Sequence, residues 1–292
     1  MHRLIHETFN SQIHARGHAL AAHLRELDFV FSQNTQDIKK IELPKLLYNS
    51  QFNLLDANSQ PQGDVIAIIP YEGLMTKYSW WRFAAADIAA ALMEYYNDPA
   101  IAGIILRANT YGGTLEAIIE VENALTKRNK PVMGFIDSNC YSAGVYNCIA
   151  HTDGVYASNP KAGLGSIGVM TQVMDDSKYL EKWGMTVKSI YPPESKYKNE
   201  NVREALAGND KPMIEEFLSP WARGFQDAVK DARPKLDLSI KGIIEGKEFF
   251  ASDAVNYNLI DGIMPIEDMI DMVFQKSKDY KSTQRQIKSI LN

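Results

Sequence analysis

The chain has 292 residues, of which 45% are hydrophobic, so it can bury a sizeable core as one large domain with appendages. Its formal net charge of -5 gives no general basic surface, and a nucleic acid is not an expected partner. No run approaches the ~18 apolar residues that a membrane span requires, and the first residues lack the apolar stretch of a secretory signal. We therefore expect a cytoplasmic protein without a membrane span.

The first 63 residues differ from the rest and are expected to form a helical arm and a linker. They hold five of the six histidines, including the pairs His2/His6 and His14/His18, each spaced four residues apart. Such spacing can bind a metal on a helix, but no cysteine accompanies these histidines and the nearby acidic residues lack ligand spacing. We predict a solvated arm without a metal, joined through a linker that ends at Gly63.

Apolar runs and helical periodicities alternate through the middle of the chain, which is typical of a parallel α/β sheet. Strands are predicted at residues 64–70, 103–108, 132–136, 154–157, 166–173 and 187–191. Helices are predicted behind Thr114, from Ser142, near residues 176–183 and along the stripe that starts at Pro212, which Pro220 could kink. Another helix carries Ile88, Leu92 and Tyr95 and ends at Asn97-Asp98-Pro99, while residues 192–208 are polar and loop-like.

Three short segments carry candidate chemistry: Asn109-Thr110-Tyr111-Gly112-Gly113-Thr114, Tyr141-Ser142-Ala143-Gly144 and Gly163-Leu164-Gly165-Ser166-Ile167-Gly168. The first two follow predicted strands and precede predicted helices. Glycines there let backbone N–H groups point at a developing oxyanion, and a serine at a helix N-terminus feels the positive end of the helix dipole. Taken singly, each pattern also fits a plain turn or a capping serine.

A serine hydroxyl is a weak nucleophile until a neighbouring base takes its proton. His151 lies nine residues after Ser142, about 13.5 Å along a shared helix, which is too far. A lysine whose pKa is lowered by burial is the alternative, and Lys196 and Lys198 lie beyond the strand predicted at residues 187–191. The pattern alone does not choose between them.

Cys140 and Cys148 flank Ser142 but are too few for a disulfide framework. We expect two buried, reduced cysteines. Cys140 stays open as a rival nucleophile, although it precedes the turn.

In their order along the chain, these motifs resemble the signal peptide peptidase A family of Ser-Lys serine peptidases, whose fold is related to the Clp protease and crotonase folds. The likeness spans Asp64 to Met264. It rests on the first two segments above and on Asp153-Gly154-Val155-Tyr156-Ala157-Ser158-Asn159-Pro160, Gly165-Ser166-Ile167-Gly168-Val169, Phe225 with Val229 and Arg233, Gly246-Lys247-Glu248-Phe249, and Ala254 through Leu259-Ile260-Asp261-Gly262.

The resemblance implies a Clp/crotonase-like α/β fold with a parallel sheet of repeated β-β-α units. It implies a peptidase domain at 64–264, preceded by the helical arm at 1–63 and followed by a C-terminal helical tail at 265–292. No cofactor is expected.

The resemblance assigns roles to single residues. Ser142 is the expected nucleophile, and Lys198 is the expected base because Ser195-Lys196-Tyr197-Lys198 resembles the family's Gly-x-His/Tyr-Lys, which leaves Lys196 as a bystander. The remaining assignments are the oxyanion hole, from the N–H groups of Gly113 and Ala143 with Gly112 shaping the loop, and a supporting hydrogen bond from Ser166 to the lysine amine.

The implied activity is endopeptidase cleavage of a peptide or protein through an acyl-enzyme, in a ring-like homo-oligomer. Because the membrane anchor of cellular members is missing from this sequence, it looks more like the phage and prophage relatives that process capsid proteins. That likeness places it in a bacterial host cytoplasm or a phage prohead. Tyr111 and Ala143 depart from the family's Pro and Gly. The alternatives are an inactive ring-forming scaffold and a crotonase-like acyl-CoA enzyme.

Overall fold

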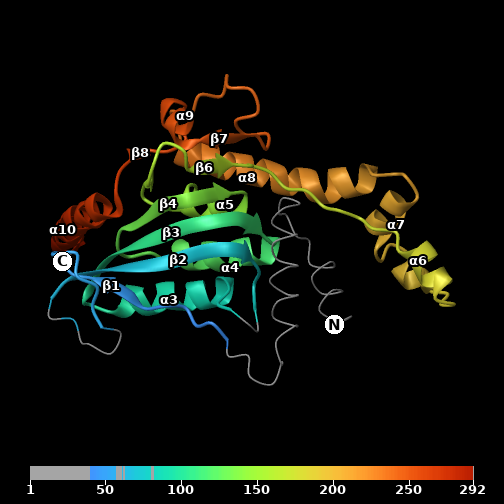
Figure 1. Ribbon diagram of the computed structural model, residues 1–292, viewed down its shortest axis with the longest axis horizontal. Helices are drawn as coiled ribbons and strands as arrows, with labels where there is room; N and C mark the ends of the chain where they lie inside the picture. The colour runs from blue at the N-terminus through green and yellow to red at the C-terminus, as the bar shows by residue number, and fades with distance from the viewer. Residues whose placement is uncertain (1–39, 57–60, 62, 80–81, 292) are drawn as a thin grey trace.

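The computed structural model describes residues 40–56, 61, 63–79 and 82–291, with side chains described as far as residue 281. An eight-stranded mixed sheet forms its centre (Figure 1). The strands are β1 Leu46–Tyr48, β2 Val65–Met75, β3 Ile101–Gly113, β4 Val132–Tyr141, β5 Val155–Ala157, β6 Gly163–Gly165, β7 Glu248–Phe250 and β8 Gly262–Ile263. Their order is β1-β2-β3-β4-β5-β8, with β6 pairing to β4 and to β7.

The α/β class is confirmed, since strand and helix alternate from β2 to α5 and the pairs from β2 through β5 to β8 are all parallel. Among the named strands of the described residues, the antiparallel pairs are β1 with β2 and β7 with β6. Strand β1 precedes the boundary expected at residue 63 and is nevertheless part of this sheet. The predicted histidine-rich arm lies mostly outside the described residues.

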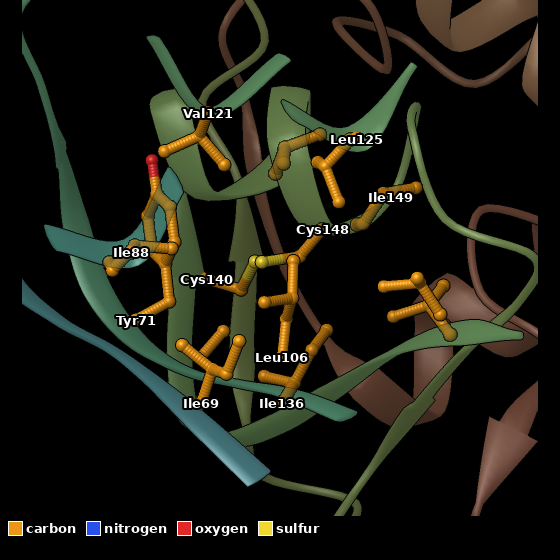
Figure 2. Close-up of a cluster of buried hydrophobic side chains, with 14 of the residues drawn as sticks. Ile69, Tyr71, Ile88, Leu106, Val121, Leu125, Ile136, Cys140, Cys148 and Ile149 are labelled. Carbon is orange, nitrogen blue, oxygen red and sulfur yellow. The ribbon is translucent and has the colours of Figure 1, made fainter. Parts of the chain in front are cut away.

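Helices cover both faces of the sheet. Successive side chains of β2 point to opposite faces, and the apolar side chains on each face pack against helices. Val65, Ala67 and Ile69 share a core with α3 (Ala85–Asn97), α4 (Leu115–Leu125) and α5 (Ala143–Cys148). Ile66 and Ile68 face the other way, against the buried first half of α10 (Ile266–Leu291). Figure 2 shows part of the first core, where Ile88 of α3 and Val121 of α4 lie over Ile69 and Leu106 of the strands.

Local chemistry fixes the ends of these helices. Thr114 is the N-cap of α4 as predicted, because its hydroxyl accepts the N–H of Ala117 at 3.3 Å. Helix α3 ends at Asn97 as predicted, two residues before Pro99. Residues 212–232 are helical as predicted, with the π-helical turn η2 (Met213–Leu218) leading into α8 (Ser219–Ala232) and Pro220 in the first turn of α8.

Two predicted strands are absent from the described part of the chain. Residues 166–173 cannot continue an extended ladder because Ser166 has φ 57° and Gly168 φ 153°, and the strand β6 lies just before them instead. Residues 187–191 find no neighbouring strand, and Val187 and Ile190 are 73% and 78% exposed. The segment 192–208, predicted as a loop, contains the 3-10 turn η1 (Pro193–Ser195) and the helix α7 (Glu200–Leu206).

Residues 170–212, which we call the outer segment, leave the sheet after β6. This segment carries α6 (Ser177–Lys182), η1 and α7, and none of these three elements has a buried residue. Figure 1 places α6 and α7 beyond the sheet, at the far end of α8, whereas the other end of α8 lies near β6, β7 and α9 (Ala251–Asn256). No helix within the described residues is long and apolar enough to cross a bilayer.

We predict that replacing Leu92 by alanine lowers the free energy of unfolding by about 2–5 kcal/mol, because this α3 side chain is fully buried against the sheet. Denaturant unfolding followed by circular dichroism measures the change. Met93→Ala is the matched control: Met93 is 37% exposed, and its truncation should cost less than about 1 kcal/mol. Equal losses in the two variants would contradict this packing.

Candidate active site

Ser142 lies at the turn between β4 and α5, where the sequence predicts a nucleophile. Its backbone has φ 51° and ψ -113°, a conformation that residues other than glycine rarely adopt. It is the N-cap residue of α5, yet its side chain makes no capping hydrogen bond. The alternative interpretation of Ser142 as an ordinary helix cap is therefore wrong, and its hydroxyl is available for another partner.

Two backbone hydrogen bonds hold Ser142 in this turn. Its N–H donates to the carbonyl oxygen of Gly165 at 3.0 Å, and its carbonyl oxygen accepts the N–H of Tyr146 at 3.0 Å. Ser166, next to Gly165, also has a positive φ of 57° and donates its N–H to Lys247 at 3.0 Å. The second and third sequence motifs thus meet directly through their backbones.

The loop from Asn109 to Gly113 forms the last part of β3. Strand β3 contains a bulge there, since Gly73 of β2 pairs with Thr110 and the next residue, Leu74, pairs with Gly112. Tyr111 is the extra residue, and Gly112 has φ 112°. The N–H of Gly112 donates to the Thr110 hydroxyl at 3.0 Å.

Several contacts join this glycine loop to the turn that carries Ser142. Thr110 pairs with Cys140 across the β3–β4 ladder. The rings of Tyr111 and Tyr141 stack at a centroid distance of 6.0 Å with planes 10° apart. A Cβ on Gly144 would lie 2.6 Å from Cγ2 of Thr110, so the first turn of α5 fits against β3 only as glycine. The structure therefore brings Gly112, Gly113 and Ser142 to the same end of the sheet.

The helix that follows Ser142 is covered on its outer side. Ala143 is fully buried and packs with Leu115 and Ile118 of α4. Phe217 of η2 and Trp221 of α8 pack against this cluster, and Ser142 itself is only 4% exposed. As the first residue of α5, Ala143 has an N–H without an intrahelical acceptor.

Both lysine candidates lie on the outer segment, away from Ser142 within one chain. Lys198 lies between η1 and α7, its side chain is exposed, and Figure 1 shows α7 beyond the sheet at the far end of α8. Lys196 is also exposed, and its amine lies 4.8 Å from the ring centroid of Tyr197. Within the described residues, no hydrogen bond or ion pair joins either lysine to Ser142 or Ser166.

The turn between the two lysines is held by Arg203 of α7. Its Nη2 donates to the carbonyl oxygen of Lys196 at 2.7 Å, and its guanidinium lies 4.9 Å from the ring centroid of Tyr191. The N–H of Lys198 donates to Ser195 at 3.0 Å. No partner of the Lys198 amine is found in the described part of the chain, so this amine is presented to solvent.

The rival groups near Ser142 are committed elsewhere. Cys140 is a free, fully buried thiol beside the free, buried Cys148 (Figure 2), as expected from the sequence. A hydrogen bond with Cys148, together with burial, raises the pKa of Cys140 well above its ordinary value, which disfavours the thiolate that a nucleophile would need. His151 lies beyond the end of α5, with Nδ1 2.8 Å from the carbonyl oxygen of Tyr146 and Nε2 3.3 Å from Glu122.

The sequence did not indicate the roles of Thr110 and Gly144. Both lie inside the motifs that drew attention to Ser142 and the glycine pair. The only signal in the sequence is the position of each residue beside a predicted functional one. No group of three His, Cys, Asp or Glu side chains that could hold a metal ion is found in the part of the chain that the structure describes.

A serine in a constrained strand-to-helix turn beside a glycine loop is the geometry that a hydrolase with a nucleophilic serine requires. The model of Peptidase family S49 matches residues 124–279, more than half of the chain. The chain belongs to this family, which comprises serine peptidases of the Ser-Lys type.

Individual relatives are distant. The chain is 24% identical over 223 residues to a protein of Enterococcus faecium assigned as signal peptide peptidase SppA, covering 73% of this chain and 62% of that protein. The chain thus spans less than two thirds of the length of this relative. A membrane-bound stomatin-specific protease, 1510-N, bound to a substrate peptide has 14% identity, coverage of 70% and 77%, and a TM-score of 0.46. An enoyl-CoA hydratase/isomerase family protein from Hyphomonas neptunium has 16% identity, coverage of 77% and 79%, and the same TM-score.

We predict that Gly144→Ala lowers the free energy of unfolding by about 1–3 kcal/mol, because the new methyl group would overlap the buried Thr110 side chain. Thermal and denaturant unfolding measure the effect. Gly224→Ala is the control: a Cβ at this α8 position meets nothing within 4 Å. It should raise the stability by about 0.5–1 kcal/mol through helix propensity, and stabilisation by both variants would refute the close contact at Gly144.

Proposed function

We propose that the protein is a serine endopeptidase in which Ser142 attacks the scissile carbonyl carbon. The observation that carries this proposal is the conformation of Ser142, whose uncapped hydroxyl stands at a positive φ beside the glycine loop. A base takes the hydroxyl proton as the C–O bond forms, and returns it to the leaving amine as the C–N bond breaks. Water, activated by the same base, then releases the acyl group from Ser142.

We infer that the oxyanion is bound by the N–H groups of Gly113 and Ala143. The N–H of Gly112 is already bonded to Thr110, so Gly112 shapes the loop rather than donating. The N–H of Thr114 donates to Met75 of β2 at 2.9 Å, and successive N–H groups of a strand point to opposite sides. The N–H of Gly113 therefore points away from β2, toward the side on which β4 and α5 lie.

Lys198 is the proposed general base, and Lys196 the alternative. The Lys198 amine has no partner within the described residues, whereas Lys196 rests on the Tyr197 ring and its carbonyl group is held by Arg203. A lysine accepts a proton at neutral pH only in a desolvated site. Since one chain leaves Lys198 in solvent, we propose that the lysine of one subunit completes the site of its neighbour, where Ser166 can hydrogen-bond the amine.

The surface of the outer segment supports this assembly. Its exposed apolar side chains are Met170, Val173, Met174, Tyr179, Trp183, Met185, Val187, Ile190, Tyr197, Val202 and Leu206. A concentration of this kind is typical of an interaction surface. We propose a ring-like homo-oligomer in which the outer segment docks on a second copy and delivers Lys198.

The substrate is proposed to be a peptide or an unfolded protein segment, in keeping with membership of Peptidase family S49. A narrower role in capsid maturation, as in phage and prophage relatives, rests on the resemblance of the motifs alone. Incubation with candidate capsid precursors and mass spectrometry of the products would test that narrower role.

The deciding experiment is peptide and casein hydrolysis by the wild type, Ser142→Ala, Lys198→Ala and Lys196→Ala. We expect Ser142→Ala and Lys198→Ala to lose activity by at least about a thousandfold, because each removes a group that acts in the bond-breaking step. Lys196→Ala should stay within about threefold of the wild type. Loss in Lys196→Ala with retention in Lys198→Ala would move the base to Lys196.

Mixing the two inactive variants tests whether the dyad spans subunits. After dissociation and random reassembly of Ser142→Ala with Lys198→Ala, about a quarter of composite sites contain both native groups. Activity near that fraction is expected, whereas a mixture as inactive as its components would place both groups in one chain. A wild type that binds but never cleaves peptides would favour the ring-forming scaffold.

We predict that Ile190→Asp in the outer segment shifts the oligomer toward monomers in light scattering and lowers peptidase activity in parallel. A charge at this 78% exposed position costs little in the single chain but cannot be buried at an interface. Leu238→Asp is the matched control, since Leu238 is 55% exposed and lies outside the outer segment. An unchanged oligomer in Ile190→Asp would contradict the proposed docking.

A further inference from the structure

We propose that Thr110 is a positioning residue that fixes the glycine loop of β3 and the start of α5 in one arrangement. This inference rests on the proposed function and concerns how the oxyanion site is built. Thr110 is fully buried and directly precedes the bulge residue Tyr111. Its side chain contacts three elements: β2, the loop of β3 and α5.

The Thr110 hydroxyl makes two hydrogen bonds at the bulge, where the regular register of the ladder is interrupted. A bulge leaves backbone groups unpaired, and buried unpaired groups are costly. The hydroxyl donates its single proton to the carbonyl oxygen of Gly73 and accepts the N–H of Gly112 at 3.0 Å. The carbonyl oxygen of Gly112 lies farther from the hydroxyl, at 3.3 Å. One hydroxyl thus bridges β2 and the loop across the irregular ladder.

The methyl group of Thr110 performs a separate task. Cγ2 lies where a Cβ on Gly144 would approach within 2.6 Å, so it packs directly on the first turn of α5. Gly144 is the second residue after Ser142. The hydroxyl therefore sets the loop that supplies Gly113, and the methyl group sets the helix that starts at Ser142.

This arrangement decides which N–H groups remain for an oxyanion. With its N–H bound to Thr110, Gly112 cannot turn that donor toward a substrate. Gly113 follows at a fixed angle, because its own position is closed by Met75: a Cβ on Gly113 would lie 2.1 Å from the Met75 carbonyl oxygen. Loss of the hydroxyl should free the loop to rotate and should misplace the Gly113 donor.

Two substitutions separate the hydroxyl from the methyl group. Thr110→Val keeps the shape and removes the hydroxyl, which leaves Gly73 and Gly112 with unpaired groups. Amide exchange, followed by mass spectrometry on peptides covering residues 109–115, should become at least about tenfold faster. The kcat for peptide hydrolysis should fall by about 10- to 100-fold with KM within about threefold, since the misplaced donor acts on the transition state.

Thr110→Ser is the conservative variant, because it keeps the hydroxyl and removes only the methyl group. Its loop exchange should stay within about threefold of the wild type, because its hydroxyl still bridges Gly73 and Gly112. Its kcat should fall less than that of Thr110→Val, through the loss of methyl packing on α5 alone. Thr152→Val is the matched control: the Thr152 hydroxyl donates to Cys148 at 2.7 Å, at the far end of α5. It should lower the Tm without changing loop exchange or kcat.

The proposal is overturned if Thr110→Val leaves both loop exchange and kcat unchanged, or if loop exchange in Thr110→Ser is as fast as in Thr110→Val. Should Thr110→Val fail to fold, Thr110→Ala against Thr110→Ser gives the same comparison of absent and present hydroxyl. Exchange is read without turnover, so it decides the role of Thr110 in the loop by itself. Absence of hydrolysis in the wild type would instead count against the proposed function.

Discussion

The strained backbone of Ser142 is the constraint on which the candidate site depends. Residues held in such sparsely populated regions cost on the order of 1–3 kcal/mol, so surrounding contacts must over-determine them. At Ser142 these contacts come from both directions: Gly165 of β6 accepts its N–H, and Tyr146 of α5 donates to its carbonyl group. The strain places a hydroxyl at the end of β4 that the local helix does not use as a cap.

The sheet makes this possible by changing the neighbour of β4 along its length. Residues 134–136 of β4 pair with β5, whereas residues 139–141 pair with β6. The exchange of partners brings Gly165 beside Ser142, and β7 closes the other side of β6. On its opposite edge β4 follows β3, whose bulge at Tyr111 turns the glycine pair toward the same end. Two irregularities at this end of the mixed sheet therefore bring the parts of the candidate site together.

Much of the core was predictable because its signals are local. Buried strands appear in the sequence as apolar runs. Thr114 marks the start of a helix because its hydroxyl can cap a backbone N–H, and Pro99 marks the end of another because its ring disfavours helical backbone before it. The polar and glycine-rich ends of β3 and β4 were predicted as loops, since nothing in Asn109-Thr110-Tyr111 signals a strand. Their pairing depends on partner strands far along the chain. A bulge that is stabilised by one threonine hydroxyl does not change the hydrophobic periodicity of the sequence, so the sequence does not reveal it. The same limit applies to residues 187–191, which were predicted to form a strand but have no partner strand within the described chain.

The outer segment explains why the candidate site of one chain has a serine but no lysine beside it. Fully burying one large apolar side chain contributes about 1.5–3 kcal/mol, while association costs an estimated 4–15 kcal/mol or more in lost freedom of motion. Trp183, Val187 and Ile190 together would offset only the lower part of that cost, so burial of several more of the exposed apolar side chains of the outer segment is needed. Lys198 lies among them on the same segment. Any docking that buries these side chains next to Ser142 of a second copy would also remove water from the lysine amine, which a neutral base requires. In the proposed enzyme, assembly and activation are thus one event, and the isolated chain holds a nucleophile without its base.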